Sequence, residues 1–152
     1  MNNVAIAVGS NVGDRQAHID FALGRLRDVL SEVVVSSLYE TEPVGVEPQP
    51  SFLNGAIIGR TSLGAHDLLR TLLQIEREGG RERPHPGAPR TLDVDLILYG
   101  DEVIDEPDLQ IPHPRFRERL FVLDPLAEIA ADWMDPVTGR SIKELRDRRR
   151  VG

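Results

Sequence analysis

The stretch from Gly87 to Leu98 reads Gly-Ala-Pro-Arg-Thr-Leu-Asp-Val-Asp-Leu-Ile-Leu, and it holds the clearest structural signal in the chain. Its apolar residues alternate with other residues, which predicts a β-strand. The apolar side chains expected on one face of this strand are Leu92, Val94, Leu96 and Leu98. Successive side chains of a strand point to opposite faces, so Asp93 and Asp95 share the other face, with Cα atoms roughly 6.6 Å apart.

Two carboxylates this close repel each other, and a divalent cation offsets that repulsion directly. Mg²⁺ prefers one or two carboxylates, with its other positions filled by water and substrate phosphates. Arg90, just before the strand, offers a planar fork to a phosphate. The stretch therefore predicts a magnesium–nucleotide site on a sheet face. The alternative is that Asp93 and Asp95 only form the solvated face of an antiparallel sheet.

Around this stretch, apolar periodicity predicts helices at 14–31 and 64–78 and strands at 4–8, 32–39, 52–61 and 92–98. The order βαββαβ is that of a ferredoxin-like α+β sandwich, with one mainly antiparallel sheet and two helices on one face. The other face is then free for a ligand. Short strands at 102–104 and 109–111 and helices at 123–131 and 141–150 form a C-terminal helical and irregular extension. We expect residues 1–152 to be a single domain.

Three loop features suggest ligand contacts. Residues 40–50 form a long, proline-rich connection, and such loops are usually functional or disordered. Asn54 follows it, where its carboxamide either caps a turn or reads the edge of a flat heterocycle. The loop with Arg81, Arg83 and Arg90 faces the two aspartates, which favours an anion-plus-metal site over surface salt bridges. The glycine-rich turn at 9–14 lacks the lysine of a P-loop, so it is interpreted as a strand-to-helix turn.

Composition narrows the class of protein. The 152 residues are 40% hydrophobic and 28% charged, contain no cysteine and carry a formal charge of −7. The absence of cysteine excludes disulfides, zinc–thiolate sites and a thiol nucleophile. The acidic balance argues against a nucleic-acid partner. The first residues show no basic leader and too short an apolar run for a signal or membrane segment. We expect a cytoplasmic monomer that binds neither nucleic acid nor membrane.

The chain resembles a known family, the 6-hydroxymethyl-7,8-dihydropterin pyrophosphokinases. The signature Gly-x-Pro-Arg-x-x-Asp-hydrophobic-Asp, followed by two apolar residues, is matched in full by 87–97. The resemblance continues in Ala-Val-Gly-Ser-Asn at 7–11, in Tyr-Glu-Thr-Glu-Pro-Val-Gly at 39–45 and in Phe-Leu-Asn at 52–54. It also includes Ile-Pro-His at 111–113 and Arg-Leu-Phe at 119–121.

The resemblance implies a set of residue roles. Asp93 and Asp95 would hold two Mg²⁺ ions that bridge the phosphates of ATP, and Asp95 would also lie near the substrate hydroxyl. The expected ATP contacts are Arg81, Arg83, Arg90, His113 and Arg119. The expected catalytic residues are Arg81, Arg83, Arg90 and Asp95. The expected pterin contacts are Thr41, Val44, Phe52, Asn54 and Phe121, with Phe52 and Phe121 stacking on the ring.

The implied reaction transfers pyrophosphate from ATP to the hydroxymethyl group of the pterin, releasing AMP, in folate biosynthesis. The chain departs from the family pattern at Gly87, where many members have tryptophan, and at Phe52, where tyrosine is common. Two other classes remain as alternatives. One is another magnesium-dependent nucleotidyl- or phosphotransferase that uses the same aspartates. The other is an RNA-binding module, which would need exposed aromatic residues where the aspartates stand.

Overall fold

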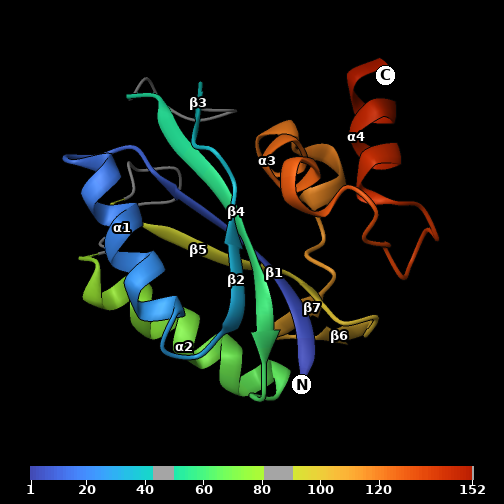
Figure 1. The fold of residues 1–152 in the computed structure, drawn as a ribbon, viewed down its shortest axis with the longest axis horizontal. Coiled ribbons are helices and arrows are strands. Elements are labelled where there is room, and N and C mark those ends of the chain that lie inside the picture. The colour runs from blue at the N-terminus through green and yellow to red at the C-terminus, as the bar shows by residue number, and fades with distance from the viewer. Residues whose placement is uncertain (43–49, 81–90, 152) are drawn as a thin grey trace.

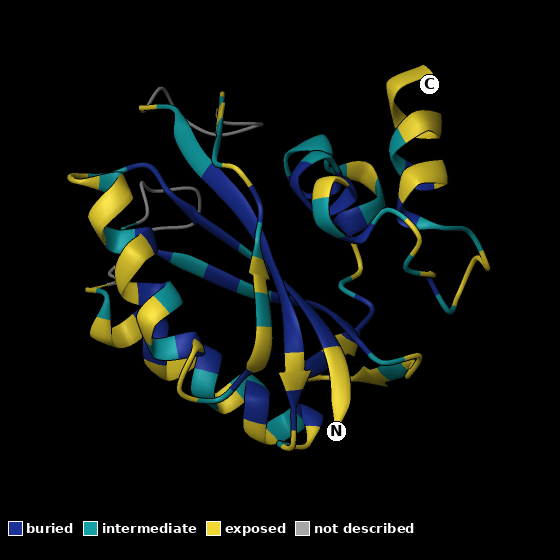
Figure 2. Cartoon of the chain, viewed as in Figure 1, coloured by how far each residue is buried: buried dark blue, intermediate teal, exposed yellow. Residues whose placement is uncertain are grey.

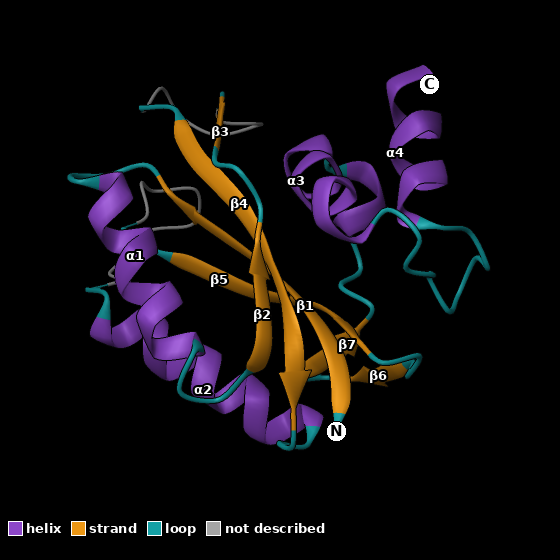
Figure 3. Cartoon of the chain, in the orientation of Figure 1, coloured by secondary structure: helices purple, strands orange, loops and turns teal. Residues whose placement is uncertain are grey.

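The structure, a computed structural model, describes residues 1–42, 50–80 and 91–151. The main strands are β1 (Asn2–Ser10), β2 (Ser31–Val35), β3 (Tyr39–Thr41), β4 (Phe52–Thr61) and β5 (Asp93–Tyr99). A separate hairpin contains β6 (Ile104–Glu106) and β7 (Leu109–Ile111). The helices are α1 (Arg15–Leu26), α2 (Ala65–Glu78), the 3₁₀ helix η1 (Phe116–Glu118), α3 (Leu120–Ala130) and α4 (Ile142–Val151). The fold is mixed α+β (Figures 1 and 3).

One antiparallel sheet has the strand order β2-β4-β1-β5, and the short β3 also pairs with β4. The two longest strands pair without interruption, from Asn2 opposite Thr61 to Ser10 opposite Leu53. Both are buried along most of their length (Figure 2). Their hydrogen-bonded ladder therefore forms a rigid centre on which the neighbouring strands are placed.

Helices α1 and α2 cover one face of the sheet (Figure 1). Val4, Ile6 and Val8 of β1 point to this side, because alternate residues of a strand share a face. Apolar side chains at helical spacing on the two helices pack against them. They are Ile19, Ala22 and Leu26 of α1 and Leu68, Leu72 and Ile75 of α2. Burying each leucine or isoleucine side chain contributes about 1.5–3 kcal/mol, so this layer supplies much of the stability.

The opposite face is not free, as the sequence had led us to expect. Ala5, Ala56, Ile58 and Ile97 project from it into a second core that contains Phe116. Residues of α3 and α4 complete this core, so the C-terminal extension packs on the sheet. The expectation was wrong because the apolar side of α3 needs a surface, and the small alanines of β1 and β4 provide a flat one. A ligand is then restricted to the end of the sheet that this extension leaves open.

Strand β5 changes face near its end. Ile6 pairs with Leu96 but the preceding Ala5 pairs with Leu98, so Ile97 is an extra residue in the ladder. A bulge of this kind inverts the alternation beyond it. Leu98 therefore joins the α3 core, and its predicted place beside Leu96 is wrong.

Other predicted boundaries shift modestly. The predicted strand at 32–39 divides into β2 and β3. Val35 pairs with Ile57 and Tyr39 pairs with Asn54, so residues 36–38 lie opposite only residues 55–56 and interrupt the regular pairing. Helix α1 ends at Leu26, earlier than predicted, and α3 begins at Leu120, earlier than predicted. In the described part of the chain, none of the helices has the length and apolar character needed to cross a lipid bilayer.

Candidate active site

Asp93 and Asp95 lie on one face of β5, as the alternation predicted. Asp93 pairs with Gly9 of β1, and Asp95 pairs with Ala7. Residues that are directly opposite in an antiparallel pair point to the same face, and so do residues two apart on one strand. Both aspartates are half-buried, and the Oδ1 atom of Asp93 is shielded from solvent. Two carboxylates of β5 thus point to the same side of the sheet.

Asn54 of β4 stands in the same row as Asp93. Gly9 pairs with Asn54 on one side and with Asp93 on the other, so the three residues form a line across β4, β1 and β5. Neighbouring strands are about 4.8 Å apart, so the backbones of Asn54 and Asp93 are roughly 10 Å apart. The next row is Ala56, Ala7 and Asp95. On this face β1 places no side chain larger than a methyl group between the amide and the carboxylates.

The side chain of Asn54 is held in place from two sides. It is buried, and its Nδ2 donates a hydrogen bond of 2.5 Å to Oγ1 of Thr41 on β3. Its Oδ1 lies only 2.6 Å from where a Cβ of Gly9 would stand. Phe52 pairs with Thr41 and is half-buried. The structure therefore brings together three of the predicted pterin contacts, Thr41, Phe52 and Asn54.

The other predicted contacts in the described chain are close to the start of α3. His113 is tied to β5, because its backbone N–H donates to the carbonyl of Ile97 at 3.0 Å. The Arg119 guanidinium lies 5.5 Å from the centre of the Phe121 ring, a cation–π distance. Ile97 is two residues beyond Asp95, so His113 reaches the sheet close to the aspartates. Val44, Arg81, Arg83 and Arg90 lie outside the described residues.

His113 is neutral near pH 7. Burial lowers the pKa of His113 to about 4, and the positive charges of Arg119 and Arg115 act in the same direction. Nδ1 of the ring accepts the backbone N–H of Arg115 at 3.2 Å. A neutral imidazole has one N–H, so this hydrogen bond assigns the proton to Nε2. The ring can therefore donate a hydrogen bond to an anion without carrying a charge.

Two anchors near the turn at 9–14 were not singled out from the sequence. Asn11 is buried, and its Nδ2 donates to the carbonyl of Pro50 at 3.0 Å. Arg15 donates to the carbonyl of Ser51 at 3.0 Å and forms an ion pair with Glu40 at 2.6 Å. These contacts fix the chain on both sides of the proline-rich connection, next to Thr41 and Phe52. The turn thus helps to position the chain next to Thr41 and Phe52, a role that its sequence alone does not reveal.

Glu76 of α2 was also missed. Its carboxylate is buried and accepts the backbone N–H of Val94, between the two aspartates, at 2.8 Å. A signal was present in the sequence, because Leu68, Leu72 and Glu76 are spaced by four residues and share the apolar stripe of the helix. A carboxylate on such a stripe needs a partner inside the protein.

Glu128 of α3 connects the C-terminal extension to β3. It accepts hydrogen bonds from the Tyr39 hydroxyl at 2.7 Å, the Ser37 amide at 2.8 Å and the Ser37 hydroxyl at 3.1 Å. The hydrogen bond from Tyr39, followed by that from the Ser37 amide, lowers the pKa of Glu128. This contact holds the strand that carries Thr41 against α3.

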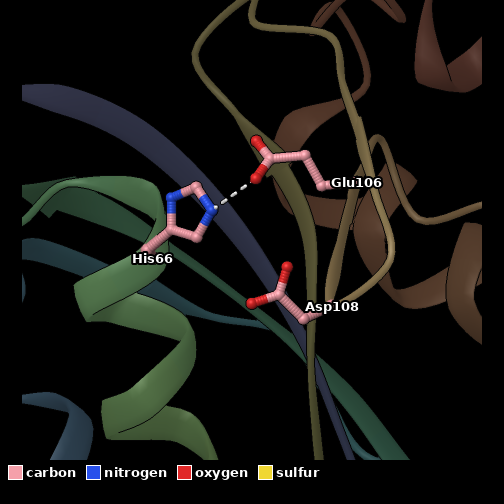
Figure 4. Close-up of side chains that lie close together, drawn as sticks. All are labelled: His66, Glu106 and Asp108. Atoms are coloured by element: carbon pink, nitrogen blue, oxygen red, sulfur yellow. Dashed lines mark hydrogen bonds and ion pairs between the residues drawn. The ribbon is translucent and has the colours of Figure 1, made fainter.

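A second group of ligand-type side chains lies at the other end of α2. His66, Glu106 and Asp108 place one nitrogen or oxygen atom each within 4.8 Å of one another. His66 Nε2 and Glu106 Oε1 are 3.1 Å apart (Figure 4), and Glu106 and Asp108 are exposed while His66 is half-buried. The pair fastens the β6–β7 hairpin to the first turn of α2, as a surface ion pair does. It lies ten residues, about 15 Å along the helix, from Glu76.

Paired aspartates on a sheet, with a hydrogen-bond-donating histidine tied to the same strand, are typical of enzymes that transfer phosphate-containing groups. Residues 5–131 match the model of the 7,8-dihydro-6-hydroxymethylpterin-pyrophosphokinase family. The chain belongs to this family, and it is a transferase of the pyrophosphokinase type that works in folate biosynthesis.

Curated relatives support this assignment along most of the chain. The 2-amino-4-hydroxy-6-hydroxymethyldihydropteridine pyrophosphokinase of Bacillus subtilis is 50% identical over 132 residues, which cover 85% of this chain and 79% of that protein. The enzyme of the same name from Aquifex aeolicus is 37% identical over 146 residues, covering 96% of this chain and 91% of that protein.

Solved structures share the fold. A Plasmodium falciparum HPPK-DHPS chain is similar with a TM-score of 0.77 at 14% identity, covering 97% of this chain. This chain corresponds to only 43% of the length of that structure. At such low identity the likeness concerns the fold alone.

Proposed function

We propose that this chain transfers the β,γ-pyrophosphoryl group of ATP to the hydroxymethyl oxygen of 6-hydroxymethyl-7,8-dihydropterin and releases AMP. The observation that carries the proposal is the row of Asn54, Gly9 and Asp93. It places an amide suited to a heterocycle edge and a carboxylate suited to a cation on one face, two strands apart. The acceptor ring and the charged donor then meet over β1.

The paired aspartates fit magnesium. Both offer hard oxygen ligands from adjacent same-face positions, and one oxygen of Asp93 is shielded from water. Asp93 and Asp95 would hold two Mg²⁺ ions, which would supply positive charge next to the phosphates of ATP. Asp95 would also orient the hydroxyl of the acceptor.

The acceptor side is supported by the β3–β4 ladder. Asn54 and Thr41 are hydrogen-bonded to each other, and they would present donor and acceptor groups to a ring edge. Phe52 and Phe121 would stack on the two sides of the ring. Val44 completes the proposed set of pterin contacts.

On the donor side, the residues stabilise charge and no side chain forms a covalent intermediate. The Nε2–H of His113 and the guanidinium of Arg119 would bind phosphate oxygens. Arg81, Arg83 and Arg90 would complete the cationic set. The hydroxymethyl group gives up its O–H proton to solvent and its oxygen forms a bond to the β-phosphorus, as the bond from that phosphorus to the α,β-bridging oxygen breaks and AMP leaves. Catalysis comes from positioning and charge neutralisation.

The direct test is AMP formation from ATP and Mg²⁺, with and without the dihydropterin, resolved by chromatography. We expect AMP and a pyrophosphorylated pterin in the complete mixture, and AMP only when the pterin is present. A nucleotidyltransferase would instead release pyrophosphate and a nucleotidylated acceptor. A folded protein that binds ATP but forms no AMP would overturn the acceptor assignment.

We also propose the finer structural assignments. The strand order β2-β4-β1-β5 with α1 and α2 on one face supports a ferredoxin-like form of the α+β class. A single domain and a monomer, checked by limited proteolysis and light scattering, are consistent with a sheet whose one core contains α1 and α2 and whose other core contains α3 and α4. The cytoplasm remains the predicted location, and nucleic acid and membranes are not expected partners.

A further inference from the structure

Glu76 is a buried acid whose partner lies between the proposed metal ligands. The residue is only 3% exposed, a degree of burial that is rare for glutamate. Its Oε2 accepts the Val94 amide at 2.8 Å from the last turn of α2, on the face of the sheet opposite to the aspartates. A carboxylate near the C-terminal end of a helix gains nothing from the helix dipole. Helix stability therefore does not explain this acid.

The geometry of β5 explains what the hydrogen bond does. Among the described strands, β5 stands at one edge of the sheet, with β1 on its inner side. The Val94 N–H points outward to Glu76, so Val94 and Val8 form a pair that does not exchange hydrogen bonds. Hydrogen-bonded and non-hydrogen-bonded pairs alternate along an antiparallel ladder. The pairs on either side, Asp93 with Gly9 and Asp95 with Ala7, are therefore joined by backbone hydrogen bonds. Glu76 and β1 thus hold the three-residue segment from both sides.

We propose that Glu76 is a positioning residue for the paired aspartates. By holding the Val94 amide, it fixes the Asp93–Val94 peptide plane, which adjoins the Cα atom of Asp93 and lies one residue before Asp95. An edge strand without such a partner can twist or bulge, and β5 already contains a bulge at Ile97. Magnesium demands near-ideal geometry, so a small rotation of either carboxylate weakens its binding. This inference rests on the proposed magnesium site.

The packing of α2 separates this role from general stability. Ala65, Leu68, Leu72 and Ile75 already anchor the helix in the core. Loss of the Glu76 hydrogen bond is therefore expected to leave α2 in place and to act on β5. Groups that support metal ligands in this way typically change metal affinity or activity by about 10- to 100-fold when removed.

The experiment compares Glu76→Gln, which keeps an oxygen acceptor, with Glu76→Asp, which keeps the charge but is too short, and Glu76→Ala. Glu78→Gln is the matched control, because it removes a charge from the same helix at a half-exposed ion pair with Arg25. Binding of Mn²⁺ to each protein with a non-hydrolysable ATP analogue is measured by electron paramagnetic resonance. Exchange of the Val94 amide is measured by NMR without metal.

We expect Glu76→Asp and Glu76→Ala to weaken Mn²⁺ binding by about tenfold or more and to speed exchange of the Val94 amide. Glu76→Gln and Glu78→Gln should stay within about threefold of the parent protein, with pterin affinity unchanged in all four variants. Unchanged Mn²⁺ binding in Glu76→Ala, or a loss in Glu76→Gln as large as in Glu76→Asp, would overturn the positioning role.

The test remains decisive if the shorter variants do not fold. In that case Glu76→Gln must bind Mn²⁺ normally, and the Val94 amide of the parent protein must exchange slowly despite its place on an edge strand. Fast exchange of that amide would contradict the inference. Failure of the proposed function shows differently, as a parent protein that forms no AMP with the dihydropterin.

Discussion

The carboxamide oxygen of Asn54 occupies the space in which Gly9 would carry a side chain. Its Oδ1 is 2.6 Å from the position of a Gly9 Cβ, closer than real Cβ contacts come. Gly9 has extended backbone, so its value lies in missing bulk and not in conformational freedom. The absence of a methyl group lets the amide of β4 lean over the central strand.

Gly9→Ala is expected to displace the Asn54 side chain from Thr41 and to weaken pterin binding by about tenfold, the effect of losing roughly one well-placed hydrogen bond. Affinity for an ATP analogue should stay unchanged. Pterin affinity is measured by fluorescence titration. Gly55→Ala is the control, because its Cβ would meet the movable end of Leu38 on the other side of the sheet. Equal effects in the two variants would show that the loss reflects general damage to the sheet.

Asp95→Asn should abolish turnover while the protein stays folded. The amide keeps the shape of the side chain but removes the charge that a cation needs, so we expect kcat to fall by about 10³-fold or more. Thermal unfolding and pterin binding should change little, and AMP formation gives the readout. Asp101→Asn, at an exposed turn after β5, is the matched control. Substantial turnover in a folded Asp95→Asn protein would exclude the metal assignment.

Asp135→Asn should destabilise the C-terminal extension. Asp135 is fully buried and pairs with Arg117 through two hydrogen bonds of 2.5 and 2.8 Å. Breaking a buried pair leaves a charge without its partner and costs about 3 kcal/mol, measurable by urea unfolding. The exposed pair of Arg146 and Asp147 supplies the control, since Asp147→Asn should cost less than about 0.5 kcal/mol. A similar cost for both variants would contradict this ranking.

Acid should also weaken the fold through Asp135. Burial alone would raise the pKa of Asp135, but hydrogen bonds from Arg117, Thr138 and the Val137 amide outweigh it and lower the pKa. The unfolded chain therefore takes up this proton first as pH falls below about 4, and the stabilisation is lost from there downward. Asp135→Asn should show a smaller loss of stability over this acidic range.

His113 gives a pH dependence at milder acidity. Because its pKa falls from 6.5 to about 4 on folding, the unfolded chain binds more protons between these values. The free energy of unfolding therefore rises with pH across this window and falls as the solution is acidified. The half-buried ring is partly screened by solvent, so the contribution is on the order of 1 kcal/mol. His113→Gln should flatten the slope between pH 7 and pH 4.5, and identical slopes would rule out this role.

Local patterns were enough to predict much of the fold. Strand β4 was predicted with its observed bounds, and α2 ends at Glu78, before Gly79, as predicted, because period and turn residues are local signals. The bulge at Ile97 was not predicted, since it depends on how β5 meets β1. The packing of α3 on the second face of the sheet was also not predicted. An amphipathic pattern shows that a helix packs against something, but it does not show against which surface.

For the candidate site too, the features that depend on one segment were predictable and those that depend on contacts between segments were not. The shared face of Asp93 and Asp95 follows from alternation along one strand. The proximity of Thr41 to Asn54 could be expected only from the family resemblance, because it needs the pairing of β3 with β4. The roles of Gly9 and Glu76 depend on contacts across strands and between α2 and β5, which no single-segment pattern contains.

The contact of Glu128 with Ser37 and Tyr39 limits how such enzymes can be recombined. This one carboxylate joins α3 to the strand that bears Thr41, so the C-terminal helices and the acceptor-binding strands form one mechanical unit. A chimaera that takes its C-terminal third from a relative without a matching acid would retain both aspartates and still hold the proposed pterin contacts, Thr41 among them, less firmly. The two parts must therefore be exchanged together.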